Sequence, residues 1–478
     1  MTLDFVINDF WRFEIVGNSN AEVVVIDKPE FFKFLERNGF GKIYLDGEKM
    51  KPTYVRIKDN IARVVSRDTI ITFSRLYIRE REPESYRRNM IYSAFIETIL
   101  SKPESAYSML KVSHVEFLSD LRDTIYFYFS NKIIAVTKSG VTEISYLDAP
   151  GVIWEDQILD FNILVTEDER YWFSSDFNQF LINISKAELQ TVAGIRYQSI
   201  LSATGYLIHE YRDLSKMKAV ILMDANLSPT PEGGAGKGLF IQAIKQVRQT
   251  VVEDGKNFTF NTRFLFQQVR PSTRVLFFDD VTKRFDFERL FSTITDGIIV
   301  ERKHRDRFVI PAEKSPRIVA STNYVIIGNG GSFERRKFEF EFSSHYNRSH
   351  SPVDEFGHIF FQEWSDEEWN KFYNLIFYAC KQYLNTGLVT APSINRDLKL
   401  LIQSTSPEFF DFSQEDISLD NEYNKKDLFQ TFIRQYPDFS HMKQRTFTSW
   451  LRSFAEVRNI RINERKSGEN YFVRFIRD

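Results

Sequence analysis

A glycine-rich segment between a hydrophobic run and a helical pattern is the feature that most constrains the fold of this chain. The run over residues 219–223 is entirely apolar and predicts a buried strand. The segment Gly-Gly-Ala-Gly-Lys-Gly over residues 233–238 follows it and leads into a helix. Small residues there let backbone N–H groups turn toward phosphate oxygens, and the N-terminus of the helix adds positive potential. The segment therefore predicts a phosphate-binding loop. The alternation of strands and helices from residue 219 to residue 342 predicts a mostly parallel sheet around it.

The usual form of this loop, G-x-x-x-x-G-K-[ST], is matched only in part. Pro231 stands where the first glycine belongs, and Gly238 stands where a hydroxyl group would bind Mg²⁺. Lys237 is expected to reach the β- and γ-phosphates of ATP. The alternative interpretation is a flexible glycine turn, and it stays open at this point. The residues expected to surround the nucleotide are Gly233, Gly234, Ala235, Gly236, Lys237, Gly238 and Leu239.

Two acidic residues and one amide end later hydrophobic runs. Asp279 and Asp280 follow residues 275–278, and Asn323 follows residues 317–322. A buried strand that delivers two carboxylates suits a Mg²⁺ site and the polarisation of an attacking water. Asp279 and Asp280 are the candidate metal ligands, Asp280 is also expected to polarise the water, and Asn323 is expected to position the γ-phosphate. Each of them alone is equally explained as a turn residue.

Two arginines precede the alternating run of residues 338–342. Arg335 or Arg336, offered to the nucleotide of a neighbouring subunit, would stabilise the charge of the transition state. The alternative is a solvated basic cluster before an edge strand. Four independent turns do not explain the order of loop lysine, paired aspartates, asparagine and arginines. This order is typical of a compact AAA+-like P-loop NTPase motor, an α/β fold.

A further segment carries a family resemblance. Residues 297–305 resemble the DNA-contacting β-hairpin of papillomavirus replicative helicases, in which a Lys-His pair lies at the tip, and residues 276–282 resemble the second ATPase motif of that family. Superfamily 3 helicases combine these motifs with such a hairpin. The wider layout, over roughly residues 90–478, resembles the primase-helicase proteins of bacterial mobile elements and phages, relatives of the poxvirus primase-helicase. In those proteins a similar Gly-Gly-x-Gly-Lys-Gly loop recurs.

The resemblance implies ATP and Mg²⁺ as cofactors, and single-stranded or forked DNA, further subunits of a hexameric ring and replication proteins as partners. It does not extend to primase activity, because no convincing acidic pair ends an N-terminal strand. The hairpin tip would contact DNA phosphates without reading sequence, whereas the alternative is a charged surface hairpin. Its residues are Arg302, Lys303, His304 and Arg305.

The last part of the chain predicts a winged helix. Two helical patterns, at residues 427–435 and 445–454, precede a hairpin over residues 460–475 with a turn at Lys466-Ser-Gly468. Many winged helices bind protein instead of DNA, and that alternative stays open. The residues expected to form a basic face for DNA are Arg445, Arg452, Arg461, Arg465 and Lys466.

The remaining segments divide at changes of pattern. We expect a mixed α+β N-terminal domain over residues 1–85, a helical and β collar-type domain over 86–195, the ATPase core over 196–345, and a helical segment over 346–405 that packs on the core. The winged helix occupies residues 422–478. A strand over residues 23–26, one helix after it and a helical zone from about residue 88 to 121 are expected in the first part. The acidic residues 407–424 predict a linker.

Composition excludes several classes of protein. The formal net charge of -2 excludes a uniformly basic surface, so any charge that binds DNA must be local. The single cysteine, Cys380, excludes an internal disulfide framework and a cysteine-based zinc site. The N-terminal residues do not form a signal peptide, and no apolar run reaches the roughly 18 residues that span a bilayer. A cytoplasmic protein without membrane segments is expected.

These features together predict an ATP-dependent, ring-forming DNA helicase or translocase of a mobile element or phage replication system. Two alternatives remain. The first is an AAA+-like ATPase that remodels protein and grips polypeptide with the hairpin. The second is a DNA-binding replication initiator or regulator without enzymatic activity, in which Pro231 and Gly238 mark a degenerate nucleotide site.

Overall fold

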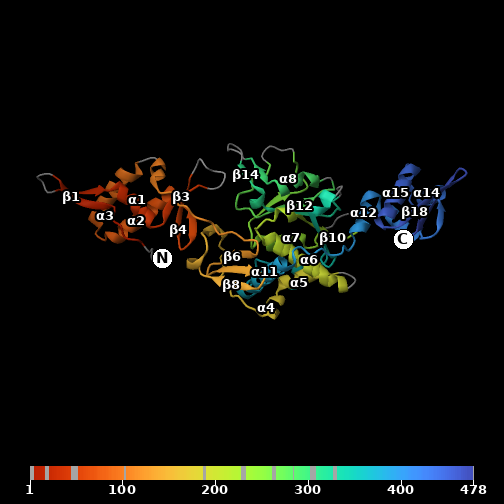
Figure 1. Cartoon of the computed structure of the whole chain (residues 1–478), viewed down its shortest axis with the longest axis horizontal. Coiled ribbons are helices and arrows are strands. Elements are labelled where there is room, and N and C mark those ends of the chain that lie inside the picture. The colour runs from red at the N-terminus through yellow and green to blue at the C-terminus, as the bar shows by residue number, and fades with distance from the viewer. Residues whose placement is uncertain are drawn as a thin grey trace. The chain divides into compact units, whose positions relative to one another are not determined.

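The computed structural model describes residues 5–16, 21–44, 52–101, 104–186, 190–227, 233–260, 265–283, 285–301, 308–326 and 331–476. The chain divides into two compact units (Figure 1). The first unit consists of Met1–Asp120, Thr124–Ala135 and Val141–Ile163, and the second of Leu121–Asp123, Val136–Gly140 and Leu164–Asp478. No helix among the described residues is both long and apolar enough to cross a membrane.

The first unit combines small antiparallel sheets with helices around an aromatic core. Phe10, Phe31, Phe34, Tyr77 and Phe95 are among its fully buried side chains. Its elements are β1 (Trp11–Val16), β2 (Ala21–Ile26), α1 (Lys28–Arg37), β3 (Phe40–Ile43), β4 (Thr53–Lys58), β5 (Ile61–Val64), α2 (Arg67–Arg81), α3 (Ser85–Phe95), η1 (Ile96–Leu100), η2 (Glu104–Met109), β6 (Thr124–Tyr128), β7 (Ile133–Thr137), β8 (Val141–Ile144), η3 (Tyr146–Asp148), β9 (Ile153–Trp154) and η4 (Glu155–Gln157).

Two predictions for this unit need correction. Helix α2 was not predicted, because its capping box pairs Ser66 with Thr69 and lacks the Glu or Gln that marks such a box in a sequence. The helical zone expected up to residue 121 ends at Met109. Beyond it, Val112 and Phe117 form isolated β-bridges with Lys42 and Val152, so backbone pairing replaces the helix. The strand expected over residues 23–26 and the helix after it are confirmed.

A five-stranded sheet forms the centre of the second unit. Its strands lie in the order β11-β12-β15-β10-β16 and all neighbouring pairs are parallel, which confirms the predicted parallel sheet. The strands are β10 (Ala219–Asp224), β11 (Thr250–Asp254), β12 (Val275–Val281), β15 (Arg317–Thr322) and β16 (Lys337–Phe342), and the short helices α7 (Lys237–Lys245), η6 (Phe287–Arg289), α8 (Leu290–Thr295), η7 (Ala312–Lys314) and α9 (Gly331–Arg335) connect them.

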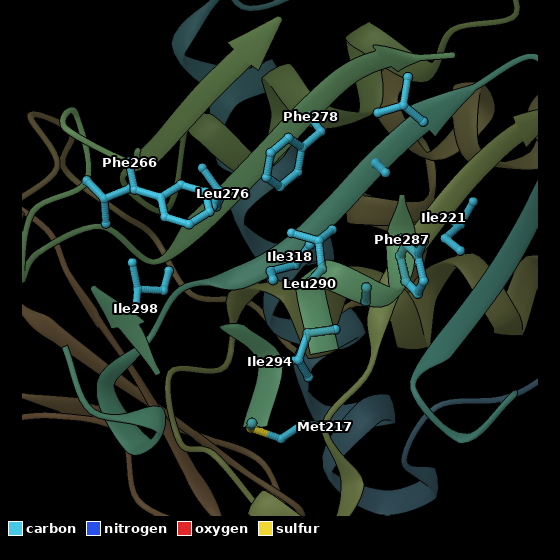
Figure 2. Packing of buried hydrophobic residues seen from close by; sticks show 14 of the residues in the cluster. Met217, Ile221, Phe266, Leu276, Phe278, Phe287, Leu290, Ile294, Ile298 and Ile318 are labelled. Atoms are coloured by element: carbon cyan, nitrogen blue, oxygen red, sulfur yellow. The ribbon is translucent and has the colours of Figure 1, made fainter. Parts of the chain in front are cut away.

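One face of this sheet packs against a dense apolar cluster (Figure 2). Ile221, Leu276 and Ile318 of neighbouring strands point into the cluster, where Leu290 and Ile294 of α8 meet them. Alternate residues of the same strands, such as Val220 and Val319, are equally buried on the other face. A parallel sheet covered on both faces exposes only the ends of its strands. Ligands of such sheets bind outside the carboxyl ends of the strands, where Lys237, Asp279, Asp280 and Asn323 lie.

Helices surround the sheet in the second unit. Helix α11 begins after Ser365, whose hydroxyl accepts from the N–H of Glu368 at 3.3 Å, and ends before Gly387 at φ 68°. Helix α6 crosses α11 closely, because Gly205 lies where a Cβ atom would be 2.5 Å from the Cβ of Tyr383. The helices are α4 (Glu169–Phe173), α5 (Asp176–Ile184), α6 (Gln190–Ile208), η5 (Leu214–Lys216), α10 (Pro352–Phe356), α11 (Asp366–Thr386) and α12 (Arg396–Ser404).

Residues 407–476 form a module with its own core, called the C-terminal module below. Its elements are α13 (Pro407–Glu415), β17 (Glu422–Asn424), α14 (Lys425–Gln435), η8 (Pro437–Phe439), α15 (Gln444–Val457), β18 (Arg461–Ser467) and β19 (Asn470–Ile476). The linker predicted over residues 407–424 is wrong for its first half, which is helix α13. Ser406 caps this helix, and Phe409 and Phe412 are buried in the core, whereas the acidic residues that indicated a linker occupy its exposed face.

Candidate nucleotide site

The glycine loop lies between β10 and α7, as predicted, and its described part is left-handed. Gly233, Gly234 and Gly236 have φ values of 69°, 90° and 94°, a region that favours glycine. Gly236 is the N-cap of α7, and a Cβ atom there would lie 2.8 Å from the ring of Phe180. The loop thus needs glycine both for its backbone shape and for space, and its N–H groups precede a helix N-terminus.

Lys237, the first residue of α7, lies in a polar network at the carboxyl edge of the sheet. Its ammonium group donates to Oδ2 of Asp224 at 2.8 Å and to Oδ1 of Asn323 at 2.9 Å. Asp224 ends β10, and Asn323 follows β15, the neighbouring strand. Burial opposes ionisation of Asp224, but the charges and hydrogen bonds of Lys237 and Lys399 outweigh burial and lower its pKa.

The two aspartates lie at an irregularity of β12. The register of β12 against β15 shifts between Phe278 and Val281, and Asp280 has a φ of 56°. The hydroxyl of Ser321 on β15 accepts from the N–H of Asp280 at 2.7 Å and donates to Oδ1 of Asp279 at 2.7 Å. One serine thus fixes both residues of the pair. A non-glycine residue in the left-handed region costs free energy and persists where the surroundings hold it, which is common at functional sites.

Asn323 connects the loop lysine to the acidic pair. Its amide oxygen accepts from Lys237, and its amide nitrogen donates to Oδ1 of Asp280 at 3.4 Å. Lys256, after β11, forms an ion pair of 2.6 Å with Oδ2 of Asp280. The hydrogen bond to that carboxylate and its charge raise the pKa of Lys256. The structure therefore brings Lys237, Asn323 and Asp280, three of the predicted site residues, into one network.

Gly238 leaves room for the hydroxyl group that the usual loop carries. A Cβ atom at Gly238 would meet no atom of the described residues within 4 Å, and its φ is outside the left-handed region. The carboxylates of Asp279 and Asp280 suit Mg²⁺, since that ion prefers oxygen ligands. Asp279 is exposed and Asp280 is partly exposed, so both are accessible from solvent.

Asp224 and Lys256 were not predicted as site residues. The signal for Asp224 was present, because an acidic residue directly ends the apolar run of residues 219–223. In a parallel sheet such a residue lies at the edge where ligands bind. No sequence signal marks Lys256, which comes into the site only because β11 pairs with β12.

The two predicted finger arginines lie at the opposite edge of the sheet. The N–H of Ala219, at the start of β10, donates to the carbonyl of Arg336 at 2.8 Å. A strand of this length spans about 20 Å, so Arg336 does not reach the glycine loop of its own chain. The guanidinium of Arg336 lies 5.1 Å from the centre of the Phe291 ring, and Arg335 is exposed and donates to the carbonyl of Gly331.

The expected DNA-binding residues are described only in part. Strands β13 (Ile298–Val300) and β14 (Phe308–Ile310) pair antiparallel, which confirms the base of the predicted hairpin. Its tip, with Arg302, Lys303, His304 and Arg305, lies outside the described residues.

The predicted basic face of the C-terminal module is partly neutralised. Arg452 pairs with Glu464 at 3.0 Å, and Arg465 pairs with Glu422 at 2.5 Å. The ammonium of Lys466 lies 5.4 Å from the Tyr471 ring centre. Arg445 and Arg461 are exposed.

A cluster of histidines near the glycine loop is explained by hydrogen bonds. Ligand atoms of His345, His350 and Glu355 lie within 4.8 Å of one another, close enough to surround a metal ion. The ammonium of Lys186, however, lies 3.1 Å from Nδ1 of His345 and can only donate to it. Nε2 therefore carries the proton that points at Glu355, 2.9 Å away, and has no lone pair free for a metal.

Comparisons with known proteins give weak likenesses. No protein-family model matches the sequence, and no curated protein matches it. Among solved structures, the apo A form of the NrS-1 C-terminal region is similar at 11% identity and a TM-score of 0.40, over 94% of this chain and 98% of that chain. A second structure of that region has 11% identity and a TM-score of 0.36 over 93% and 98%. JCV helicase with a bound small molecule has 12% identity and a TM-score of 0.24, over 35% of this chain and 46% of that chain. Likenesses with TM-scores this low carry no argument about function. A function can therefore be inferred only from the geometry of the site.

Proposed function

We propose that this chain is an ATP-dependent DNA helicase or translocase that works as a ring. One observation carries the proposal. The lysine of a left-handed glycine loop at a helix N-terminus is joined through Asn323 to Asp280, one of two carboxylates on a neighbouring part of the same edge. Cation, amide and paired carboxylates are the groups that bind phosphates, hold Mg²⁺ and polarise water in nucleotide hydrolysis.

In the proposed reaction each group has a separate task. The N–H groups of the loop, from Gly233 to Leu239, and the ammonium of Lys237 bind the phosphates of ATP. Asp279 would hold Mg²⁺, which when bound would supply positive charge against the phosphate oxygens. Asp280 takes up the proton of the attacking water, and the amide of Asn323 orients that water against the γ-phosphate. Gly238 offers no hydroxyl to the metal, so further ligands of Mg²⁺ would be water and phosphate oxygens.

The position of the arginines supports the proposal of a ring. Arg336 lies at the amino edge of the sheet, away from the nucleotide site of its own chain. We infer that it completes the site of an adjacent subunit, with Arg335 beside it. A contact between two different surfaces of identical subunits closes into a ring when its rotation closes, and we propose a hexamer.

Contact with DNA is proposed for the hairpin tip at residues 302–305 and for the C-terminal module, which we interpret as a winged helix. The sequence resemblance to mobile-element and phage proteins assigns the activity to such a replication system. Replication proteins are its proposed partners, and the proposed location is the cytoplasm.

The test is ATP turnover by the full chain with Mg²⁺, measured with and without single-stranded DNA. We expect turnover that DNA stimulates, and a ring mass in solution when nucleotide is present. Stimulation by unfolded polypeptide instead of DNA would favour a protein-remodelling ATPase. Absence of turnover, with DNA binding intact, would favour an initiator or regulator without enzymatic activity and would refute the proposal.

A further inference from the structure

Helix α12 brings a second lysine to the carboxylate that holds the loop lysine. Lys399 is 8% exposed, and its ammonium group donates to Oδ1 of Asp224 at 2.8 Å and also to the carbonyl oxygen of Asp224. The other carboxylate oxygen, Oδ2, accepts from Lys237 at 2.8 Å. Asp224 itself is 7% exposed. One buried carboxylate is therefore shared by two ammonium groups that come from distant parts of the chain.

This sharing matters when Lys237 changes partner. A triphosphate in the glycine loop competes with Asp224 for the ammonium of Lys237. A buried carboxylate that loses its last cationic partner is strongly destabilised, so it would retain Lys237 and oppose phosphate binding. With Lys399 in place, Asp224 stays compensated after Lys237 leaves.

Helix α12 is anchored in a way that keeps Lys399 in position. The side-chain amide of Gln403 accepts from the N–H of Val325 at 3.0 Å and donates to the carbonyl of Val325 at 3.0 Å, two residues beyond Asn323. Leu401 is fully buried in the core cluster of the C-terminal module. The helix is thus fixed on both sides, and Lys399 is preorganised toward Asp224.

We propose that Lys399 is a positioning residue for nucleotide binding, which holds Asp224 so that Lys237 can move from that carboxylate to the phosphates. The proposal rests on the proposed function, because it requires that Lys237 binds a triphosphate. Nothing in the sequence around residue 399 indicates this role, since 175 residues separate Lys399 from Asp224 along the chain.

The test is the affinity of the full chain for ATPγS with Mg²⁺, measured by calorimetry. Lys399→Gln should weaken binding roughly ten- to hundred-fold, because Asp224 then holds Lys237 as its only cation. Adding Asp224→Asn to that variant should restore affinity to near the wild-type value, since no carboxylate then competes for Lys237. Arg396→Gln is the matched control: it removes a cation of the same helix, which pairs with Glu339 at 3.0 Å and not with Asp224. Its affinity should equal that of the wild type.

Two results would overturn the inference. One is wild-type affinity in Lys399→Gln. The other is a double variant that binds as weakly as Lys399→Gln, which a merely structural role of the lysine would give. If Lys399→Gln does not fold, Lys399→Met, which keeps the aliphatic stem, takes its place in the single and in the double variant. Absence of ATPγS binding in the wild type, or wild-type binding in Lys237→Ala, would contradict the proposed function instead.

Discussion

Positively charged side chains occupy two contrasting settings in the second unit. Beside the central sheet, Arg196 and Lys399 are 1% and 8% exposed and donate to buried oxygens of Glu341 and Asp224. In the C-terminal module, the side chains of Arg452 and Arg465 are 62% and 54% exposed and pair with carboxylates at the surface. Breaking a buried pair costs several kcal/mol, whereas an exposed pair contributes about 0–1 kcal/mol. The buried cations therefore fix geometry, whereas the exposed pairs contribute little to stability.

The largest effect is expected at the loop lysine. Lys237→Ala should lower ATP turnover at least about a hundred-fold, because it removes the ammonium that meets the β- and γ-phosphates. Steady-state ATPase rates measure this loss. Lys245→Ala removes an exposed cation from the other end of α7 and should leave the rate unchanged. Equal rates in Lys237→Ala and in the wild type would show that the glycine loop is not a nucleotide site.

The next largest effect is expected on stability, which should fall more when a buried cation is removed than when an exposed one is. The guanidinium of Arg196 donates to the carbonyl of Pro392 at 2.9 Å and to that of Glu341, and lies 4.9 Å from the centre of the Phe340 ring. Arg196→Gln should lower the free energy of unfolding by about 3 kcal/mol, because the carbonyl of Glu341 then stays buried without this donor. Arg465→Gln should lower it by less than about 1 kcal/mol. Thermal and urea unfolding of both variants measure these changes in the free energy of unfolding. Equal losses in the two variants would contradict the distinction between buried and exposed cations.

Local sequence predicted the edge of the sheet at which the site lies. An apolar run, a glycine loop and polar residues at strand ends are local patterns, and parallel strands bring their carboxyl ends together. Lys237, Asp280 and Asn323 could therefore be predicted as neighbours. Helix α11 carries local signals of the same kind, because Ser365 and Gly387 mark its two ends.

The rest of the site depends on contacts between distant segments. Lys399 reaches Asp224 only because α12 packs at the strand ends, and no periodicity in the sequence encodes that packing. Helix α13 was missed for a different reason. Its acidic residues indicated a linker, but Phe409 and Phe412 are buried, and packing of such an apolar face stabilises a helix.

Arg336 offers a test of the ring that does not depend on the DNA-binding residues. Arg336→Ala and Lys237→Ala should each inactivate the ATPase alone, because each removes one half of a site shared between subunits. On random mixing about one interface in four joins two intact halves, so up to a quarter of wild-type turnover should return. The measurement is ATP turnover of the mixture, with mixed rings verified by mass. No recovery in verified mixed rings would contradict a site completed in trans.

The smallest effect is expected for cations on the surface of the C-terminal module. The salt dependence of DNA affinity shows which of these cations contact DNA. Each Lys or Arg that contacts a phosphate releases counterions, so its loss lowers the slope of log affinity against log salt by roughly 0.7 on single strands. Arg445→Ala and Lys466→Ala should each lower the slope by about that amount, since Arg445 is exposed and the Lys466 ammonium lies over an exposed tyrosine ring. The charge-neutral pair Arg465→Gln with Glu422→Gln removes an ion pair of 2.5 Å without changing the net charge, and should leave the slope unchanged. DNA affinity of the full chain across a salt series measures all three. If the neutral pair lowers the slope as much as Lys466→Ala, Arg465 leaves Glu422 on binding DNA, and exposed pairing does not keep an arginine from phosphate.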